Sequence, residues 1–277
     1  MNYKNDSRNK KGKAPVRPRD TAREPYAELS ENVIFGRNSV RELLESGRDI
    51  EKIYVSEGER EGSILSLIAE ARERRLNIVE ADRRKLDRIA LGGRHQGIIA
   101  VAAERDYSTL DDILAYAAER GEKPLVVVLD GIEDPHNLGA IIRSAECLGA
   151  HGVIIPKRRS VGLTATVSKA SAGALEHMRV ARVTNLAVAV DELKERGLWI
   201  YAADMGEGAY YENDLTGSAA IVMGSEGFGI SRLVREKCDF TLSIPLFGSV
   251  NSMNVSCAAA VLLAAGVIIV LKMKGII

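Results

Sequence analysis

Three polar turns in the second half of the chain carry side chains suited to chemistry. Each turn follows an apolar run that is typical of a strand. The turns contribute Asn137 and Arg143, then Glu226, then Ser252 and Asn254. Ligands of open α/β sheets bind at the carboxyl ends of the strands, so we expect these residues to border one site. The pattern is typical of a site that holds a nucleotide-like ligand largely through the backbone.

The second turn has an unusual glycine spacing. Gly224, Gly227 and Gly229 follow a G-x-x-G-x-G pattern within IVMGSEGFGISR. This is neither the G-x-G-x-x-G of dinucleotide-binding folds nor a phosphate-binding loop, which would also need a Lys-Ser/Thr pair. The spacing therefore argues against a Rossmann dehydrogenase and predicts a cofactor bound in another way.

Arg143 lies in a segment with helical periodicity. Leu138, Ile141, Ala145 and Leu148 are spaced to form one buried stripe. Arg143 falls outside that stripe, so helix packing does not require it. We interpret it as a residue free to act in chemistry.

The other candidates each have a purely structural alternative. Asn137 stands where a helix N-cap belongs, and capping explains it as well as function does. Glu226 has the place of an acid in the first turn of a helix, where the helix dipole favours it. Either Ser252 or Asn254 is suited to cap the final helix. Each residue alone has a structural explanation, but their joint occurrence at three turns of one predicted sheet favours a functional site.

Residues 31–105 read as a small α/β domain. Asn38 is placed to cap a first helix. The predicted elements are helices over 39–47 and 63–75 and strands over 51–56, 77–81 and 97–103. Arginines are dense at 72–75 and 82–88, which indicates either solvated helix faces or a surface for docking RNA.

Residues 106–123 read as a polar linker with one short amphipathic helix, and residues 124–277 as a second domain. Strands and helices alternate along that domain. The predicted strands are 124–130, 152–156, 177–183, 198–204, 219–224 and 240–245, and the predicted helices are 138–149, 164–175, 186–197, 231–237 and 255–271. Repeated βα units predict a parallel sheet covered on both faces.

Charge and composition limit the alternatives. Residues 1–25 carry eight Lys/Arg and three acids, and with residues 26–30 they predict a disordered basic arm that either attracts RNA or only solubilises. The arm has no apolar core, so we expect no signal peptide. Three cysteines match neither a disulfide framework nor a zinc site, and four histidines are scattered. We expect a cytoplasmic protein without metal.

The apolar run at 255–271 is near the lower length limit of a membrane helix. It is half alanine, serine, glycine and cysteine, and it starts directly after a polar turn. Small residues favour close helix packing, so we expect a buried C-terminal helix.

A family resemblance rests on three motifs. The spacing from Asn137 to Arg143, the sequence GSEGFG and the sequence IPLFGSVNSMNVS resemble the motifs of the SpoU (TrmH-like) family of RNA ribose 2′-O-methyltransferases, in the SPOUT superfamily. The resemblance covers 124–277. The N-terminal unit, with HQGIIA at 95–100, resembles the family's auxiliary RNA-binding domain. The overall pattern is closest to the 23S rRNA guanosine 2′-O-methyltransferases of the RlmB type.

The resemblance implies a fold and a cofactor that spacing does not give. It implies a C-terminal trefoil knot, although connection rules alone exclude knots. It implies S-adenosylmethionine held by the second and third motifs, and a homodimer formed through the knotted domain. The cofactor-binding residues it implies are Gly224, Ile244, Leu246, Met253 and Asn254.

The implied reaction is methyl transfer to a ribose 2′-OH of RNA. Arg143 would contact that hydroxyl, and because a guanidinium stays protonated we expect it to stabilise alkoxide charge rather than act as a base. Asn137, Glu226, Ser252 and Asn254 would orient the reactants. The expected target is a guanosine of 23S rRNA near the peptidyl-transferase region. A tRNA ribose methyltransferase, a thiostrepton-resistance-type rRNA methylase and a non-catalytic ribosome-assembly factor are the alternatives.

Overall fold

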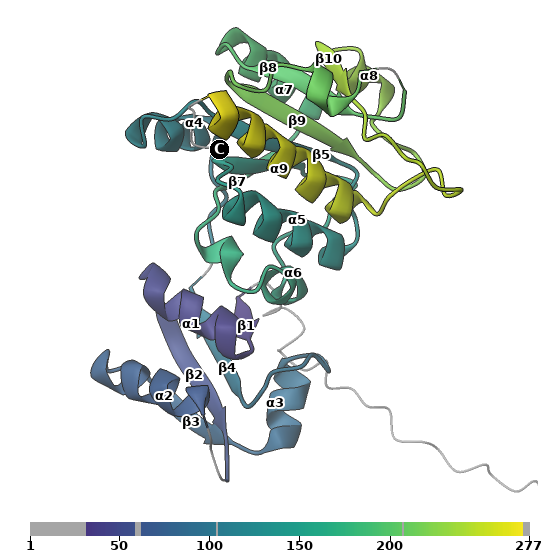
Figure 1. Cartoon of the computed structure of the whole chain (residues 1–277). Helices are drawn as coiled ribbons and strands as arrows, with labels where there is room; N and C mark the ends of the chain where they lie inside the picture. The colour runs from purple at the N-terminus through teal and green to yellow at the C-terminus, as the bar shows by residue number, and fades with distance from the viewer. Residues whose placement is uncertain (1–31, 59–61, 104, 207, 274–277) are drawn as a thin grey trace, which may run out of the picture.

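The computed structural model describes residues 32–58, 62–103, 105–206 and 208–273. They form two α/β domains, with the N-terminal domain below the second domain in Figure 1. The predicted basic arm at 1–30 lies outside the described residues.

The N-terminal domain is built on a sheet whose described strands run in the order β1-β4-β2-β3. Strand β4 is antiparallel to β1 and β2, and β3 is parallel to β2. The elements are β1 (Val33–Phe35), α1 (Arg37–Ser46), β2 (Ile50–Ser56), α2 (Ser63–Glu73), β3 (Ile78–Ala81), α3 (Arg83–Ile89) and β4 (Ile98–Ala102). Helices α1 and α2 cover one face of the sheet, and α3 covers the other. The predicted small α/β domain is confirmed.

The first helix starts earlier than the sequence suggested. Helix α1 begins at Arg37, and its N-cap is Gly36, which has a φ of 95°. Asn38 therefore lies inside the first turn, so its predicted capping role is wrong. A glycine takes a left-handed φ without strain, so the chain turns into the helix directly from β1.

The second domain contains a parallel sheet with the described strand order β10-β8-β9-β5-β6-β7. The elements are α4 (Leu110–Glu119), β5 (Leu125–Asp130), α5 (Pro135–Cys147), β6 (Gly152–Pro156), α6 (Ala165–Ala170), η2 (Ala174–Glu176), β7 (Val180–Val183), α7 (Leu186–Glu195), β8 (Trp199–Ala203), η3 (Tyr210–Glu212), β9 (Ala219–Gly224), α8 (Arg232–Arg235), β10 (Phe240–Leu242) and α9 (Val255–Met273). The predicted parallel α/β architecture is confirmed. The trefoil knot stays a prediction.

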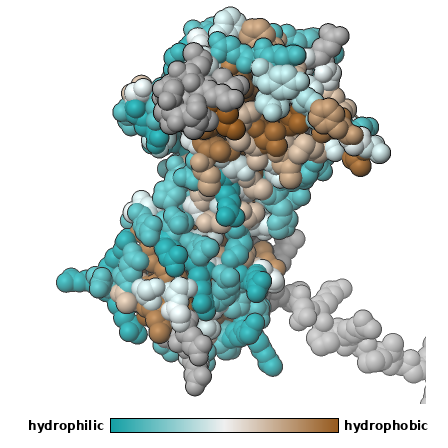
Figure 2. All heavy atoms as spheres, in the orientation of Figure 1, coloured by the Kyte–Doolittle hydropathy of each residue, from teal (hydrophilic) through white to brown (hydrophobic). Residues whose placement is uncertain are grey.

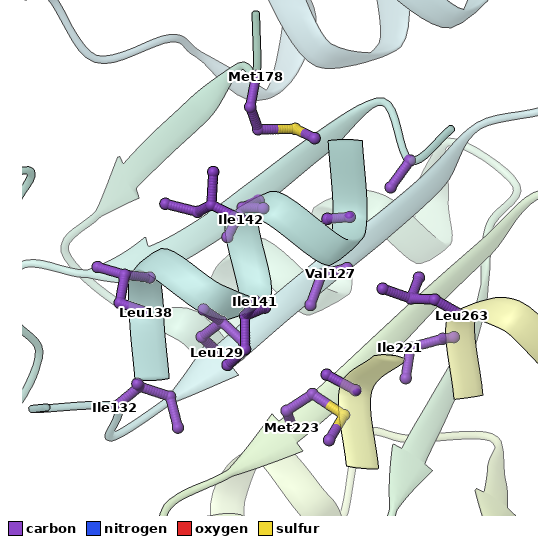
Figure 3. Packing of buried hydrophobic residues seen from close by; sticks show 14 of the residues in the cluster. Val127, Leu129, Ile132, Leu138, Ile141, Ile142, Met178, Ile221, Met223 and Leu263 are labelled. Carbon is purple, nitrogen blue, oxygen red and sulfur yellow. The ribbon is translucent and has the colours of Figure 1, made fainter. Parts of the chain in front are cut away.

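Both faces of this sheet are covered, which explains why its strands read as continuous apolar runs. Helices α5, α6 and α9 pack on one face, and α4, α7 and α8 pack on the other. Figure 3 shows Ile141 of α5 over Leu129 of β5. In the same view Leu263 of α9 lies beside Ile221 of β9. The core therefore fixes α5 and α9 against the two central strands, β5 and β9.

The segment expected to be a linker is part of the second domain. Helix α4 has a capping box between Thr109 and Asp112, and its apolar face is buried against the sheet. Ser108 donates its N–H to the carbonyl of Val180 in β7 at 2.8 Å. A Cβ on Gly152 would lie 2.5 Å from Ile113, so β6 needs glycine where α4 packs. The interpretation of 106–123 as only a linker is wrong, because α4, within that segment, packs its apolar face on the sheet of the second domain.

The C-terminal helix α9 has the expected buried face. Val255, Ala259, Leu262 and Leu263 are each at most 6% exposed. In the part of the chain that the structure describes, no helix is long and apolar enough to cross a membrane.

The two domains meet at a buried ion pair. The carboxylate of Glu176, in η2, contacts Arg48 of the N-terminal domain at 3.5 Å and also pairs with Arg105. The Glu176 side chain is 1% exposed. Burial lowers the pKa of the Arg48 guanidinium; Glu176 opposes that shift and Arg105 adds to it. Nearby, His177 contacts Glu42 across the same junction at 2.9 Å.

We predict that Glu176→Gln lowers the free energy of unfolding by about 1–3 kcal/mol, because it leaves two partly buried arginines without a carboxylate. Urea unfolding measures this change. The control is Glu192→Gln, which removes an exposed partner of Arg196 within α7. We expect that control to change stability by less than about 0.5 kcal/mol. If both substitutions change the free energy of unfolding equally, the contacts of Glu176 with the two arginines do not stabilise the junction.

Candidate active site

A cavity of about 670 Å³ opens at the carboxyl ends of β8, β9 and β10. Its walls are the turn after β9, the segment between β10 and α9, and the first two turns of α9. The predicted cofactor residues all line it: Gly224, Ile244, Leu246, Met253 and Asn254. Parallel strands place their carboxyl ends at one edge of the sheet, which is why residues so far apart in sequence meet here.

The glycine spacing of the turn after β9 has a steric cause. A Cβ on Gly224 would lie 2.2 Å from the carbonyl carbon of Gly229, because the chain folds back onto itself. Ser225 and Gly229 close the turn with two backbone hydrogen bonds of 3.1 and 2.9 Å. Gly227 and Gly229 have φ values of 90° and 66°. The first glycine is thus required by close approach and the other two by backbone conformation.

Side chains from the three predicted turns form one hydrogen-bonded cluster. The carboxylate of Glu226 accepts from the side-chain amides of Asn254 at 2.8 Å and Asn137 at 3.2 Å. Asn254 also donates to the Asn137 amide oxygen at 2.9 Å. Finally, Glu226 accepts the N–H of Val255, the first residue of α9, at 3.4 Å. The cluster therefore ties the first turn of α5 and the turn after β9 to the start of α9.

The structure resolves the capping alternatives. Asp134 caps α5 by accepting the N–H of His136 at 2.8 Å, so Asn137 is not the cap and its amide is free to reach Glu226. Glu226 does lie at a helix N-terminus, but at that of α9 and not that of the helix following it in sequence. Asn254 caps α9 by accepting the N–H groups of Ser256 and Cys257.

We predict that Asn254→Ala destabilises the protein by about 1 kcal/mol, the usual effect of losing an N-cap. It also removes two hydrogen bonds to the cluster, so ligand affinity in the cavity falls further than stability alone explains. Thermal unfolding and calorimetric titration measure the two effects. Asn185→Ala removes a similar cap from α7, far along the chain from the cluster. Equal ligand affinity in these two variants would contradict the role of the cluster.

A second cavity of about 490 Å³ adjoins the first. The two share the turn residues Ser225, Glu226 and Gly229. Asn137 and Phe228 line the second cavity, together with residues following β5. The Glu226 carboxylate therefore stands between two spaces, one bordered by the predicted cofactor residues and one by Asn137.

Arg143 is the predicted site residue that this arrangement does not include. It is exposed on α5 and lines neither cavity. It is six residues after Asn137, which is about 9 Å along a helix axis. Within the described residues it has no hydrogen bond or ion pair. The chain brings Asn137, Glu226, Ser252 and Asn254 together at its own cavities and leaves Arg143 outside them.

Two features of the site were missed in the sequence. Asp204 and Met205, directly after β8, line the first cavity. Asp204 ends an apolar run just as the other site residues do, so the same signal would have found it. Phe228 and Phe247 stand 95% and 98% exposed on the two loops beside the cavities. Among the described residues no group of three or more His, Cys, Asp or Glu side chains could hold a metal ion.

Comparison with known proteins identifies the family. The model of the SpoU rRNA methylase family matches residues 124–264, and the model for RNA 2′-O ribose methyltransferase substrate binding matches residues 33–108. The chain belongs to the SpoU methylase family. Both the family and the N-terminal substrate-binding domain were predicted, and both predictions are confirmed.

Relatives of this SpoU-family chain match most of its length. YacO of Bacillus subtilis, a protein assigned to the TrmH family of tRNA/rRNA methyltransferases, is 46% identical over 83% of this chain and 92% of its own. The crystal structure of the SpoU methyltransferase AviRb from Streptomyces viridochromogenes has a TM-score of 0.74 at 25% identity, over 90% of this chain and 92% of that chain. An RNA 2′-O ribose methyltransferase structure has a TM-score of 0.71 at 26% identity, over 89% and 96%.

Proposed function

We propose that the chain methylates the 2′-OH of a guanosine in 23S rRNA, near the peptidyl-transferase region. Membership of the SpoU family establishes the coarser activity, which is S-adenosylmethionine-dependent 2′-O-methylation of RNA. The observation that supports the proposed site of methyl transfer is the position of Glu226 between two adjoining cavities at the strand ends. One cavity suits the methyl donor, and the other suits the ribose that accepts the methyl group.

The first cavity fits S-adenosylmethionine in size and chemistry. Its volume of about 670 Å³ is within the range of small-molecule sites. Met223, Leu242 and Ile244 supply apolar walls for an adenine ring, and the backbone of the glycine turn supplies polar groups. Gly224, Ile244, Leu246, Met253 and Asn254 would hold the cofactor. When bound, it supplies a methyl group on a positively charged sulfur.

The second cavity would hold the ribose that accepts the methyl group. Asn137 has an amide whose geometry is set by Glu226, so it is held ready to orient a ribose hydroxyl. Phe228 stands fully exposed at the rim and offers a ring face on which a base can stack. Ser252, on the wall of the first cavity, faces the same space as the cofactor residues. These residues would position the reactants for methyl transfer.

The position of Arg143 supports a homodimer. A residue meant to stabilise alkoxide charge must reach the acceptor oxygen, yet Arg143 lines neither cavity of its own chain. Figure 2 shows hydrophobic residues gathered in a band over α9 of the second domain, while the N-terminal domain is mostly hydrophilic. Phe247, Val250 and Ile268 are exposed around that helix. A second copy packed on α5 and α9 would cover this band and bring the partner's Arg143 toward the cavity.

The choice of rRNA rests on the N-terminal domain. A separate domain for docking suits a large folded RNA, where shape and backbone contacts dominate recognition. Mapping 2′-O-methyl groups in rRNA and tRNA from a deletion strain tests the choice directly. Loss of one guanosine methyl near the peptidyl-transferase region is the expected result. Loss at a tRNA position instead would overturn the rRNA assignment and leave the family activity intact.

A further inference from the structure

A third cavity, of about 690 Å³, lies in the N-terminal domain near the junction with the second domain. It is bordered by the loop of residues 92–97, by the start of α1 and by α3. Arg37, Arg83 and Arg94 line it, and Asp87 is its one lining carboxylate. The lining is therefore polar and carries a net positive charge.

The loop that closes this cavity is held in a fixed shape. His95 is 5% exposed, and its Nδ1 accepts the N–H of Gly97 at 3.0 Å. The ring proton is therefore on Nε2, which donates to Asp87 at 3.0 Å. Gly97 has a φ of 84°, and a Cβ there would lie 2.9 Å from the Ser56 hydroxyl. The one carboxylate of the cavity is thus engaged by a buried histidine.

The arginines of the cavity form no ion pair within the described residues. Elsewhere in the described residues, arginines commonly pair with carboxylates, as Arg74 does with Glu70 and Arg232 with Glu236. Arg83 and Arg94 have no hydrogen bond or ion pair within the described ranges. Like charges gathered in one place repel each other, and an anion placed between them removes that cost. The arrangement suits an anionic ligand.

The second domain adds a further cation to this place. The amine of Lys169, on α6, lies 3.5 Å from the side-chain oxygen of Gln96, which also accepts the N–H of Arg37 at 3.0 Å. A Cβ on Gly36 would lie 1.8 Å from that amine, so glycine leaves the room that the lysine occupies. Burial lowers the pKa of Lys169, and the charge of Arg94 adds to the shift.

We propose that this cavity, together with Lys169, binds a phosphodiester of the RNA substrate at a distance from the methylated ribose. Guanidinium groups bind phosphate oxygens in a bidentate manner, and a rigid loop lowers the entropic cost of binding. The proposal deepens the proposed function, since it rests on RNA being the substrate. We call this cavity, with Lys169, the phosphate anchor.

Packing connects the phosphate anchor to the catalytic cluster. Helix α6, which carries Lys169, lies between the two domains in Figure 1 and packs on both α5 and β1. The contact with α5 is close, because a Cβ on Gly139 would lie 2.4 Å from that of Ala170. Asn137 is in the first turns of α5. RNA bound at the phosphate anchor is therefore held at a set position relative to the acceptor cavity.

The test is the double substitution Arg83→Gln with Arg94→Gln, measured with a 23S rRNA transcript. We expect the Kd for RNA to rise on the order of tenfold at fixed salt, and the slope of log K against log salt to fall by about one to two. The KM for RNA rises, while kcat at saturating RNA and the Kd for S-adenosylmethionine stay unchanged. The matched control is Arg72→Gln with Arg75→Gln, which removes equal charge near the end of α2, on the other face of the sheet.

The outcomes separate this proposal from the proposed function. RNA affinity and salt slope equal to those of the control variant would overturn the phosphate anchor. If the wild-type protein binds the transcript but methylates none of it, the rRNA assignment fails, and the binding data still decide the anchor. Lys169→Gln acts from the other domain and should weaken RNA binding several-fold with a normal melting curve. If the double variant unfolds, the RNA affinity of Lys169→Gln tests the phosphate anchor in its place, and an unchanged affinity would overturn it.

Discussion

Arg143→Ala is expected to lower kcat roughly a hundred- to thousandfold while S-adenosylmethionine binding stays unchanged. That is the usual effect of removing one group that stabilises developing negative charge. The side chain is exposed and unpaired within the described residues, so its removal should leave stability unchanged. Single-turnover methylation of RNA and calorimetric titration of the cofactor measure the two quantities.

Arg143→Lys is the informative control. Lysine keeps the positive charge but loses the planar fork, so we expect an activity between those of wild type and the alanine variant. A near wild-type rate for Arg143→Ala would remove Arg143 from the mechanism. It would also remove the reason to expect a second copy at the cavity.

A mixing experiment decides between action within one chain and action across a dimer. Arg143→Ala protomers are mixed with Glu226→Ala protomers, each of which we expect to have little activity alone. If Arg143 serves the cavity of its partner, each mixed dimer has one cavity with an intact Glu226 and an intact arginine, and activity returns. If Arg143 serves its own chain, every cavity lacks one group, and the mixture stays inactive.

Gly224→Ala is expected to reduce kcat/KM for S-adenosylmethionine on the order of a hundredfold, because the added Cβ displaces the turn that walls the cofactor cavity. That Cβ would lie 2.2 Å from the carbonyl carbon of Gly229 and 2.3 Å from the nitrogen of Ile230. Both atoms belong to the backbone, so no side-chain rotation relieves the clash. Overpacking of this kind also destabilises the fold by about 1–3 kcal/mol.

Gly248→Ala supplies the matched control for this prediction. Gly248 is in the loop between β10 and α9, and a Cβ there would meet no atom within 4 Å. We expect its cofactor binding and thermal stability to match the wild type. Should Gly224→Ala bind the cofactor as well as Gly248→Ala does, the turn would not be a wall of the cofactor site.

The strands of the second domain were predictable because most of their residues are apolar, as burial on both faces requires. Helix starts were less predictable. Asn38 and Asn137 both look like caps, yet a glycine with a left-handed φ begins α1, and the Asp134-Pro135 pair begins α5. The signal for α5 was present, since proline favours the first helical position. For α5, the Asp134-Pro135 pair was therefore a better start signal than Asn137 on local grounds alone.

The sequence allowed the site residues to be named, but it did not predict how they lie relative to one another. Sequence order shows that Asn137 and Glu226 each follow a strand, but only the pairing of β5 with β9 makes the ends of those strands neighbours. For Arg143 the sequence predicted exposure but not the cavity that the side chain serves. The helical pattern correctly placed it off the buried stripe, yet a pattern within one chain cannot say whether an exposed residue faces its own cavity or that of another copy.

The buried contacts of Glu176 with Arg48 and Arg105 have a consequence for which RNA molecules can be methylated. We expect this enclosed charge cluster to oppose hinge motion between the domains, so that the phosphate anchor and the acceptor cavity keep a fixed span. A structured hairpin that presents a phosphate and a ribose at that span binds without bending. A flexible strand of the same sequence must first be ordered at that span, so we expect the enzyme to favour structured RNA over an unfolded strand.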